Sequence, residues 1–302
     1  MSALTIRERS ALAAIALLTA LAGVANYGAW AAVPRFAIAT LALAGLAWVV
    51  SFATEQLGDR FGPAVTGMLQ STLGNLPELF VVIFALQKGE LVVAQTAIVG
   101  SILANALLVL GLVIVVGARR SNDGIMRFHK KLPRDTATLL QVTVFIIVLL
   151  GLSLAVTLTL LLVAGSASAF VSDWFINGLK PAIVQLHISQ AFAGLVIVAI
   201  AGNAVENTAG LVLSYKGRPD LAISVVKNSV AQIAAFLFPL LVLVSFALRT
   251  TLTFSLAPVY IGALLLSTLA LAQVTGDGDA AEFEGWALVA LYVILGALTL
   301  YE

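Results

Sequence analysis

Apolar segments of about 20 residues or more recur along the whole chain, and they limit the possible folds more than any other feature. An α-helix rises about 1.5 Å per residue, so about 20 apolar residues span the hydrocarbon core of a bilayer. Only 10% of the 302 residues are charged and 61% are hydrophobic, whereas soluble domains carry roughly 25% charged residues. The sequence therefore predicts an all-α, polytopic membrane protein. Its clearest spans cover 11–33, 36–54, 63–87, 91–117, 188–214, 221–247, 252–273 and 285–301.

One apolar stretch is too long for a simple crossing. Residues 136–172 are almost wholly apolar, and as one helix they would extend about 55 Å against a hydrocarbon core of about 30 Å. They are expected to cross either once, as a strongly tilted helix, or twice, as two short helices broken near Gly151. The residues from Asp173 to His187 are expected to form a polar connection that contains Pro181.

The loop at 118–135 carries the strongest topology signal. It has six Lys and Arg residues against two Asp residues, and the positive-inside rule therefore places it in the cytoplasm. Four predicted spans precede this loop. The N-terminus is accordingly expected to be cytoplasmic too, in a multi-pass protein of the cell (inner) membrane.

Two acidic residues interrupt the apolar segments, and both occur in the same short motif. Residues 74–78 and 202–206 each read Gly-Asn-x-x-Glu, which places Glu78 and Glu206 inside predicted spans with no Lys or Arg within one helical turn. An unpaired charge in lipid costs at least a few kcal/mol, so such a residue usually faces a cavity or an ion pathway. The pair predicts a shared site whose missing partner is a small cation.

The two motifs belong to a longer internal repeat. A shift of 128 positions (206 − 78) also aligns Lys88-Gly89 with Lys216-Gly217 and Ser101 with Ser229. Duplicated units with a polar site near the bilayer midplane are a common plan of ion transporters. If residues 136–172 cross once, the two repeats are inverted, and if they cross twice, the repeats are parallel. A transporter whose site opens to one side of the membrane and then to the other (alternating access) favours the inverted arrangement.

The repeat divides the chain into four regions. These are an N-terminal segment with the first transmembrane helix (1–34), a first repeat core with motif helices 63–87 and 91–117 and the basic loop 118–135 (35–135), a shortened connecting helical region (136–187), and a second repeat with motif helices 188–214 and 221–247 and two C-terminal helices (188–302).

Composition excludes several other classes of site and partner. The chain has no cysteine, which excludes disulfides and thiolate ligands, and its two histidines are too few to suggest a zinc site. The net charge of +1 gives no sign of a nucleic-acid partner. The expected partner is the lipid bilayer, and the oligomeric state is left open.

The motifs resemble those of the cation/calcium exchangers, and within that superfamily those of the calcium/proton exchangers. The resemblance implies a helical transporter built from two inverted repeats, like the sodium/calcium exchangers, rather than an enzyme. It implies no cofactor, and Ca²⁺ and H⁺ as the transported substrates. The matching pieces are Gly74-Asn75-x-x-Glu78 with Gly100-Ser101-Ile102-Leu103-Ala104-Asn105, and Gly202-Asn203-Ala204-x-Glu206 with Ser229 and Gln232-Ile233-Ala234.

The resemblance also implies a role for each polar position. Glu78 and Glu206 would bind Ca²⁺ or, in its absence, protons. Ca²⁺ takes six to eight oxygen ligands, whereas two facing carboxylates without an ion repel each other and take up protons as a coupled pair. The residues that would supply neutral oxygens or orient the carboxylates are Asn75, Asn203, Ser101, Asn105, Ser229 and Gln232.

Other interpretations remain open at this stage. The asparagines, serines and Gln232 are also typical of interhelical hydrogen bonds. The protein could exchange Na⁺, K⁺ or another divalent ion, or be a non-transporting cation-binding membrane protein. Asn207 and Lys227-Asn228 depart from the family pattern of a histidine, an apolar residue and a glycine. Lys227 either reaches the membrane surface or acts as a tethered cation near Glu206.

Overall fold

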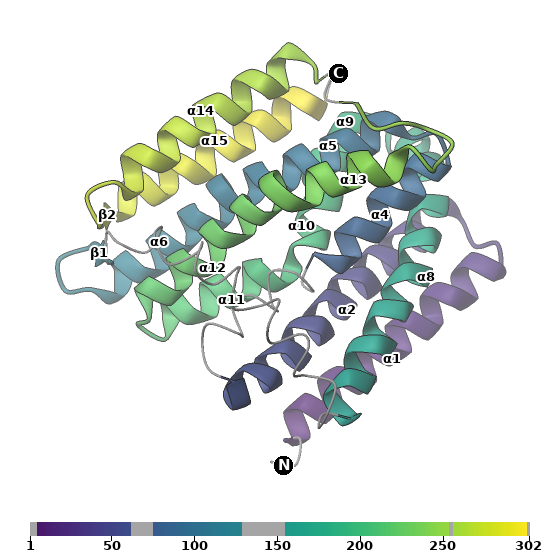
Figure 1. Ribbon diagram of the computed structural model, residues 1–302, viewed down its shortest axis with the longest axis horizontal. Helices are drawn as coiled ribbons and strands as arrows, with labels where there is room; N and C mark the ends of the chain where they lie inside the picture. Colours follow the sequence, from purple (N-terminus) through teal and green to yellow (C-terminus); the bar gives the residue numbers. More distant parts are fainter. Residues whose placement is uncertain (1–4, 62–74, 129–154, 254–255, 301–302) are drawn as a thin grey trace.

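The computed structural model describes residues 5–61, 75–128, 155–253 and 256–300. Within these ranges the chain is almost entirely helical, with one short antiparallel pair of strands (Figure 1). Elements labelled η are π-helical. The elements are α1 (Ile6–Tyr27), α2 (Ala32–Phe61), α4 (Leu76–Gln87), α5 (Leu91–Leu103), η1 (Ala104–Val109), α6 (Leu110–Arg120), β1 (Ile125–Arg127), α8 (Ala155–Leu186), α9 (Gln190–Phe192), η4 (Ala193–Val198), α10 (Ala199–Gly202), α11 (Ala204–Tyr215), α12 (Pro219–Gln232), η5 (Ile233–Leu237), α13 (Phe238–Ser245), α14 (Pro258–Thr275), β2 (Asp279–Ala281) and α15 (Glu282–Leu300).

The described helices confirm a multi-pass membrane fold. Six of them are long and apolar enough to cross a membrane: α1, the first part of α2, the continuous helix α5–η1–α6, the continuous helix α12–η5–α13, α14 and α15. The bent pair formed by 190–202 and 207–215 makes a seventh if it counts as one span. Of the predicted span 63–87, only the part from Asn75 onward lies within the described residues.

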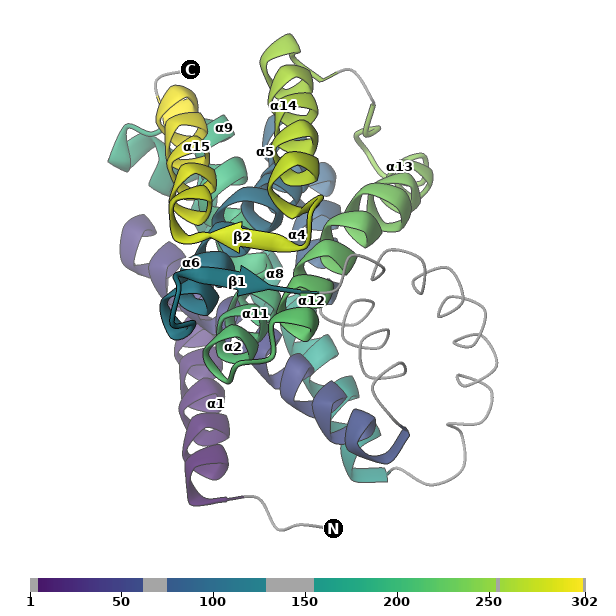
Figure 2. The ribbon, with the colours of Figure 1, turned by 90° about the vertical axis from the view of Figure 1, so that its left-hand side faces the viewer.

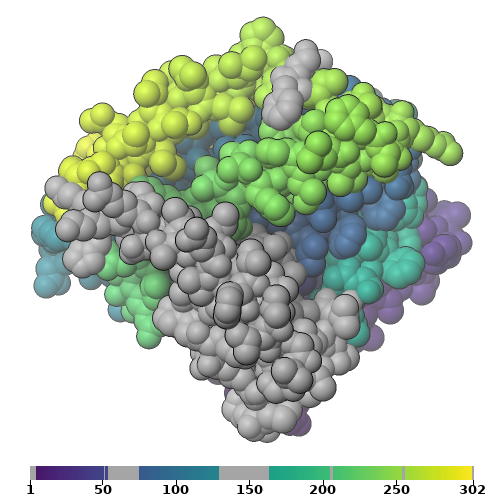
Figure 3. All heavy atoms as spheres, in the orientation of Figure 1, coloured from purple at the N-terminus to yellow at the C-terminus, as the bar shows by residue number. Residues whose placement is uncertain are grey.

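The helices form three groups: two outer groups and, between them, the motif helices. α1, α2 and α8 pack together on one side of the molecule, and α14 and α15 lie on the other (Figure 1). The third group consists of the motif helices of both repeats, which run between the two outer groups. β1 pairs with β2 and so ties the end of α6 to the start of α15 (Figure 2). On the face shown in Figure 3, α12–α13 crosses between the C-terminal helices and α4.

The predicted polar connection from Asp173 to His187 is wrong. α8 is helical without interruption from Ala155 to Leu186, and Pro181 lies inside it. The polar residues Asp173, Asn177 and Lys180 are spaced i, i+4 and i+7, so they lie on one face of the helix, while the residues between them are apolar or glycine. The predicted break near Gly151 lies outside the described residues.

The polar face of α8 binds the turn between α4 and α5. Lys88 Nζ is 2.5 Å from Asp173 Oδ1 and donates to Asn177 Oδ1 at 2.7 Å. Lys180 Nζ is 2.9 Å from Glu90 Oε1. These contacts explain why a polar segment is helical here: its charged groups have partners on the neighbouring turn.

Both repeats make the same turn between their motif helices. Gly89 and Gly217 have φ angles of 77° and 71°, a left-handed conformation that glycine adopts without steric cost. The residue after each glycine donates its backbone N–H to the carbonyl five residues earlier, at 2.9 Å in the first turn and 3.0 Å in the second. The duplication seen in the sequence is therefore also present in the backbone.

The two turns lie at opposite ends of the molecule, which makes the repeats inverted. The first turn, at 88–90, precedes the N-terminus of α5. The second, at 216–218, lies beside α6: the Arg120 guanidinium carbon is 4.8 Å from the centre of the Tyr215 ring, and Ser214 Oγ donates to Val113 O at 2.6 Å. This is the arrangement predicted for a single crossing of the connecting region.

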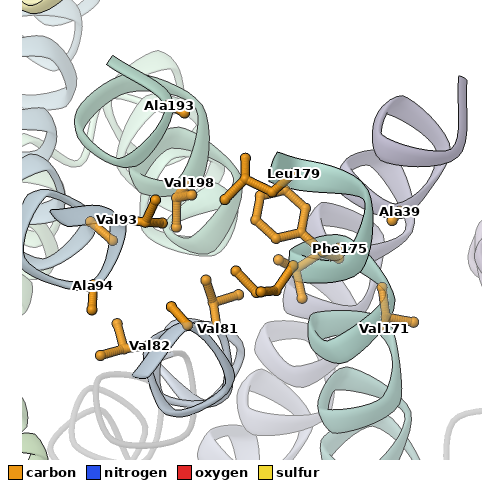
Figure 4. Close-up of a cluster of buried hydrophobic side chains, with 14 of the residues drawn as sticks. Ala39, Val81, Val82, Val93, Ala94, Val171, Phe175, Leu179, Ala193 and Val198 are labelled. Carbon is orange, nitrogen blue, oxygen red and sulfur yellow. The ribbon is translucent and has the colours of Figure 1, made fainter. Parts of the chain in front are cut away.

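An apolar cluster fills the space between α4, α5, α8 and η4 (Figure 4). The side chains that we call the apolar layer, each at most 1% exposed, are Val81, Val82, Phe175, Leu179 and Val198. On α4 the two valines follow Glu78 by about one turn in the direction of the 88–90 turn. The apolar layer therefore separates Glu78 from that end of the molecule.

Candidate cation site

Each motif asparagine lies directly before the start of a helix. Asn75 precedes α4 with φ −83° and ψ 1°, and Asn203 lies between α10 and α11 with φ −98° and ψ 21°. The segments 190–202 and 207–215 bend by 55° at the break that includes Asn203. Pro77 occupies one of the first positions of α4, where its missing N–H has no helical partner to lose. The motif therefore begins a helix at the depth of its glutamate.

The motif glutamates lie three residues after the asparagines, in the first turn of the following helix. The positive end of the helix dipole favours a negative charge there. Glu78 is fully buried in α4. The backbone of Glu206 holds the equivalent place in α11, but its side chain lies outside the described residues. The meeting of the two carboxylates therefore stays a prediction.

Glu78 of the first repeat lies against the motif of the second. A Cβ built on Gly202 would be 3.5 Å from the Cβ of Glu78 and 3.9 Å from its Cγ. Because Gly202 has no side chain, the glutamate can lie close to the helix end that precedes Asn203. Glu78 of the first motif is thus placed beside the helix break of the second.

Asn105 joins the two repeats by hydrogen bonds. Its Nδ2 donates to Asn203 Oδ1 at 2.7 Å, to Ser229 Oγ at 3.3 Å and to the Ser101 carbonyl at 3.1 Å. All four residues are fully buried. Four of the predicted site residues therefore meet in one polar cluster, which we call the Asn105 junction.

Two oxygen atoms of the Asn105 junction are suited to hold a cation. Ser101 Oγ and Asn105 Oδ1 are buried and have no hydrogen-bond partner among the residues that the structure describes, which is uncommon for buried polar atoms. Amide and hydroxyl oxygens are ligands that hard cations such as Ca²⁺ accept. The described side chains include no group of three or more Asp, Glu or His that could hold a metal. Ser101 Oγ and Asn105 Oδ1 could supply neutral oxygens to a cation bound here.

The helices that carry the junction change to π-helical geometry at equivalent positions. η1 covers 104–109, and η5 covers 233–237, which the shift of 128 aligns with 105–109. π-Helical turns inside α-helices occur frequently at functional sites. Asn105 lies within the first such segment, and Ser229 lies four residues before the second.

Two glycines allow the repeats to approach this closely. A Cβ on Gly100 would overlap the backbone of Leu195, and a Cβ on Gly194 would overlap Thr96 Oγ1. Small residues let transmembrane helices pack backbone against backbone. The crossing of α5 and η4 thereby sets Ser101 and Asn105 beside the helix that leads to Asn203.

The remaining predicted ligands lie at the edge of this arrangement. Asn75 is 5% exposed at the start of α4, and Gln232 is partly exposed at the C-terminal end of α12. Their roles as ligands stay predictions.

α8 contributes two buried serines that sequence reasoning missed. Ser172 Oγ donates to Pro77 O at 3.4 Å, and Ser168 Oγ has no hydrogen-bond partner in the described ranges. Their i, i+4 spacing was the available signal. It was hidden in residues 136–172, where two serines hardly change the apolar character of the stretch.

The chain matches one protein family twice and resembles several characterised relatives. Residues 31–163 and 156–301 each match the family described as sodium/calcium exchanger protein. The vacuolar calcium ion transporter of Schizosaccharomyces pombe is 30% identical over 330 residues, covering 90% of this chain and 80% of that protein. The Ca²⁺/H⁺ antiporter ChaA of Bacillus subtilis is 26% identical, covering 88% and 92%. The structure of native YfkE has a TM-score of 0.81 at 25% identity, covering 97% of this chain and 100% of that one.

Proposed function

Because the chain belongs to the sodium/calcium exchanger protein family, we propose that it exchanges Ca²⁺ for protons across the membrane. Its relatives include proteins named calcium ion transporter and Ca²⁺/H⁺ antiporter. The family is one of transporters, so the proposal involves movement of ions and no chemical conversion.

The Asn105 junction is the observation that carries this proposal. It gathers uncharged oxygens from both repeats at the helix break of Asn203, and Glu78 lies against Gly202, the residue before that break. Ca²⁺ would be bound by the carboxylates of Glu78 and Glu206, with Asn75, Asn203, Ser101, Asn105, Ser229 and Gln232 completing or orienting the shell.

Competition between the two ions would produce exchange. When Ca²⁺ leaves, two carboxylates in a poorly hydrated site repel each other, and protonation relieves this repulsion. The same oxygens thus hold either one divalent ion or protons. Release of one ion on each side then requires the site to open to the two sides in turn.

The inverted repeats support such alternating access, because an arrangement that opens one side has a counterpart that opens the other. We assign the α6 end, where Arg119, Arg120 and Arg127 lie, to the cytoplasm, together with the N-terminus. The 88–90 turn is then outside the cell membrane. With this orientation, the apolar layer closes the site toward the outside.

Transport by purified protein in vesicles tests the proposal. A pH gradient should drive ⁴⁵Ca²⁺ accumulation, and both Glu78→Gln and Glu206→Gln should reduce it to the level of protein-free vesicles. The matched control is Glu90→Gln, since Glu90 is also buried in the first repeat but binds Lys180 and Gln190. This variant should keep transport. Full transport by either site variant would refute the proposal.

The driving ion distinguishes the alternatives in the same assay. Ca²⁺ flux that follows a Na⁺ or K⁺ gradient, and not a pH gradient, would assign a different exchanger. Binding of Ca²⁺ by the wild-type protein without any flux would assign a non-transporting cation-binding protein.

A further inference from the structure

Lys227 and Asn207 are among the polar residues of the second repeat that stand where the first repeat is apolar. The shift of 128 aligns Lys227 with Val99 and Asn207 with Leu79. Val99 is 2% exposed and belongs to an apolar cluster. Duplication therefore does not account for Lys227, which lies within the membrane span 219–245. An ionisable residue inside a membrane span usually has a function.

Lys227 is close to the Asn105 junction along its own helix. It precedes Ser229 by two residues, so the two Cα atoms differ by about 3 Å along the axis of α12, and the two side chains leave the helix about 200° apart. Ser229 Oγ accepts a hydrogen bond from Asn105. Lys227 is partly buried, and it forms no hydrogen bond or ion pair with any residue that the structure describes. Its charge is therefore not neutralised by a described neighbour.

Asn207 offers an acceptor at the height of Lys227. α11 and α12 are antiparallel around Gly217, and Asn207 and Lys227 each lie ten residues from it, about 15 Å along each helix. Asn207 Nδ2 donates to Ile200 O at 3.3 Å, whereas Oδ1 is buried without a hydrogen-bond partner among the described residues. An amide oxygen at this height is a suitable acceptor for an ammonium group.

We propose that Lys227 places a fixed positive charge near the part of the cation site that the second repeat contributes. This charge lowers the affinity of the site for divalent cations more than its affinity for monovalent cations. This inference rests on the proposed function and adds a specificity-determining residue to the same site. Coulomb energy is proportional to the charge of the bound ion. At about 10 Å and an effective dielectric constant of about 20, one charge changes monovalent binding by roughly tenfold and divalent binding by roughly a hundredfold.

Equilibrium binding to purified protein in lipid nanodiscs tests the charge effect. ⁴⁵Ca²⁺ binding and its competition by Na⁺ are measured at one pH for the wild type, Lys227→Gln and Lys227→Arg. We expect Lys227→Gln to lower the Ca²⁺ dissociation constant at least tenfold and the Na⁺ constant by about the square root of that factor. Lys227→Arg should keep wild-type values because it keeps the charge.

The matched control is Lys216→Gln, which removes the same charge from the exposed turn between α11 and α12. It should leave the Ca²⁺ and Na⁺ dissociation constants unchanged. If Lys216→Gln had an effect as large as that of Lys227→Gln, the Lys227 ammonium would act like a charge at the membrane surface, and the proposal would be overturned. Unchanged Ca²⁺ affinity in Lys227→Gln, or equal factors for the two ions, would also overturn it. Lys227→Met, which has an unbranched apolar side chain, replaces the glutamine variant if that variant does not fold. Absence of Ca²⁺ binding by the wild type would instead refute the proposed function.

Discussion

Replacing Asn105 with leucine tests whether the Asn105 junction holds the transported ion. The change nearly preserves side-chain size and removes the amide that donates to Asn203 Oδ1 and Ser229 Oγ. A buried acceptor that loses its donor costs about 1–3 kcal/mol. With two acceptors affected, we expect the free energy of unfolding to fall by about 2–4 kcal/mol.

Stabilisation by Ca²⁺ separates this structural cost from ion binding. A ligand that binds only the folded state stabilises it by about 2.7 kcal/mol at 100 times its dissociation constant. If Asn105 Oδ1 is a ligand, we expect binding to weaken about tenfold, and the same Ca²⁺ concentration then adds only about 1.4 kcal/mol. Denaturant unfolding in detergent micelles, with and without Ca²⁺, measures both quantities through the fluorescence of the four tryptophans.

Asn177→Leu is the matched control for this experiment. Asn177 accepts from Lys88 Nζ at 2.7 Å and donates to Asp173 Oδ2 at 3.1 Å, so its replacement also removes hydrogen bonds and lowers stability. It lies outside the Asn105 junction and should keep the full stabilisation by Ca²⁺. If Asn105→Leu also keeps the full gain, or both variants lose it equally, the junction does not bind the ion.

Two further predictions concern packing and pH. Gly100→Val should prevent α5 and η4 from approaching, because any Cβ there overlaps the Leu195 backbone, so we expect the yield of monodisperse protein in size-exclusion chromatography to fall sharply. Gly262→Val, where no described atom lies within 4 Å of an added Cβ, should behave like the wild type, and similar yields for both variants would contradict the argument. The Arg127 guanidinium and then the Ser121 hydroxyl lower the pKa of Asp123 from its ordinary value of 3.8 to about 2. Because the folded-state pKa is lowered, this contact stabilises the 121–127 loop fully above about pH 4 and is lost as the pH falls through about 2. An NMR titration of the Asp123 carboxyl carbon reports this midpoint; a midpoint near 4 would show that the contact does not form, and Asp123→Asn serves as the assignment control.

Much of the fold follows from the sequence because lipid leaves a backbone few choices. Long apolar runs have to become helices that satisfy their own hydrogen bonds, so the helical spans could be predicted from length alone. The repeat was visible because residues such as Glu78, Glu206 and the turn glycines are conspicuous among apolar neighbours. Their spacing also predicted the inverted arrangement, once the connecting region was assumed to cross once.

Other features depend on partners that are distant in the sequence. The segment from Asp173 to His187 has the composition of a connection, and only the turn at 88–90, which binds its polar face, explains why it is helical. The hydrogen bonds of Asn105 cross from one repeat to the other over separations of 98 and 124 residues. Periodicity describes faces of single helices, and it does not say which faces meet or where a π-helical segment begins.

The apolar layer has a consequence for how efficiently one gradient can be converted into another. Exchange is wasteful whenever an ion slips across alone, since that ion dissipates the gradient without moving its counterpart. A cation that passed between Val81, Val82 and Phe175 would have to shed its hydration water among side chains that offer no replacement oxygen. The barrier against such a leak therefore comes from hydrocarbon contacts and is independent of the groups that recognise the ion. Under the proposed function, affinity and tightness of coupling can accordingly be altered by separate sets of residues.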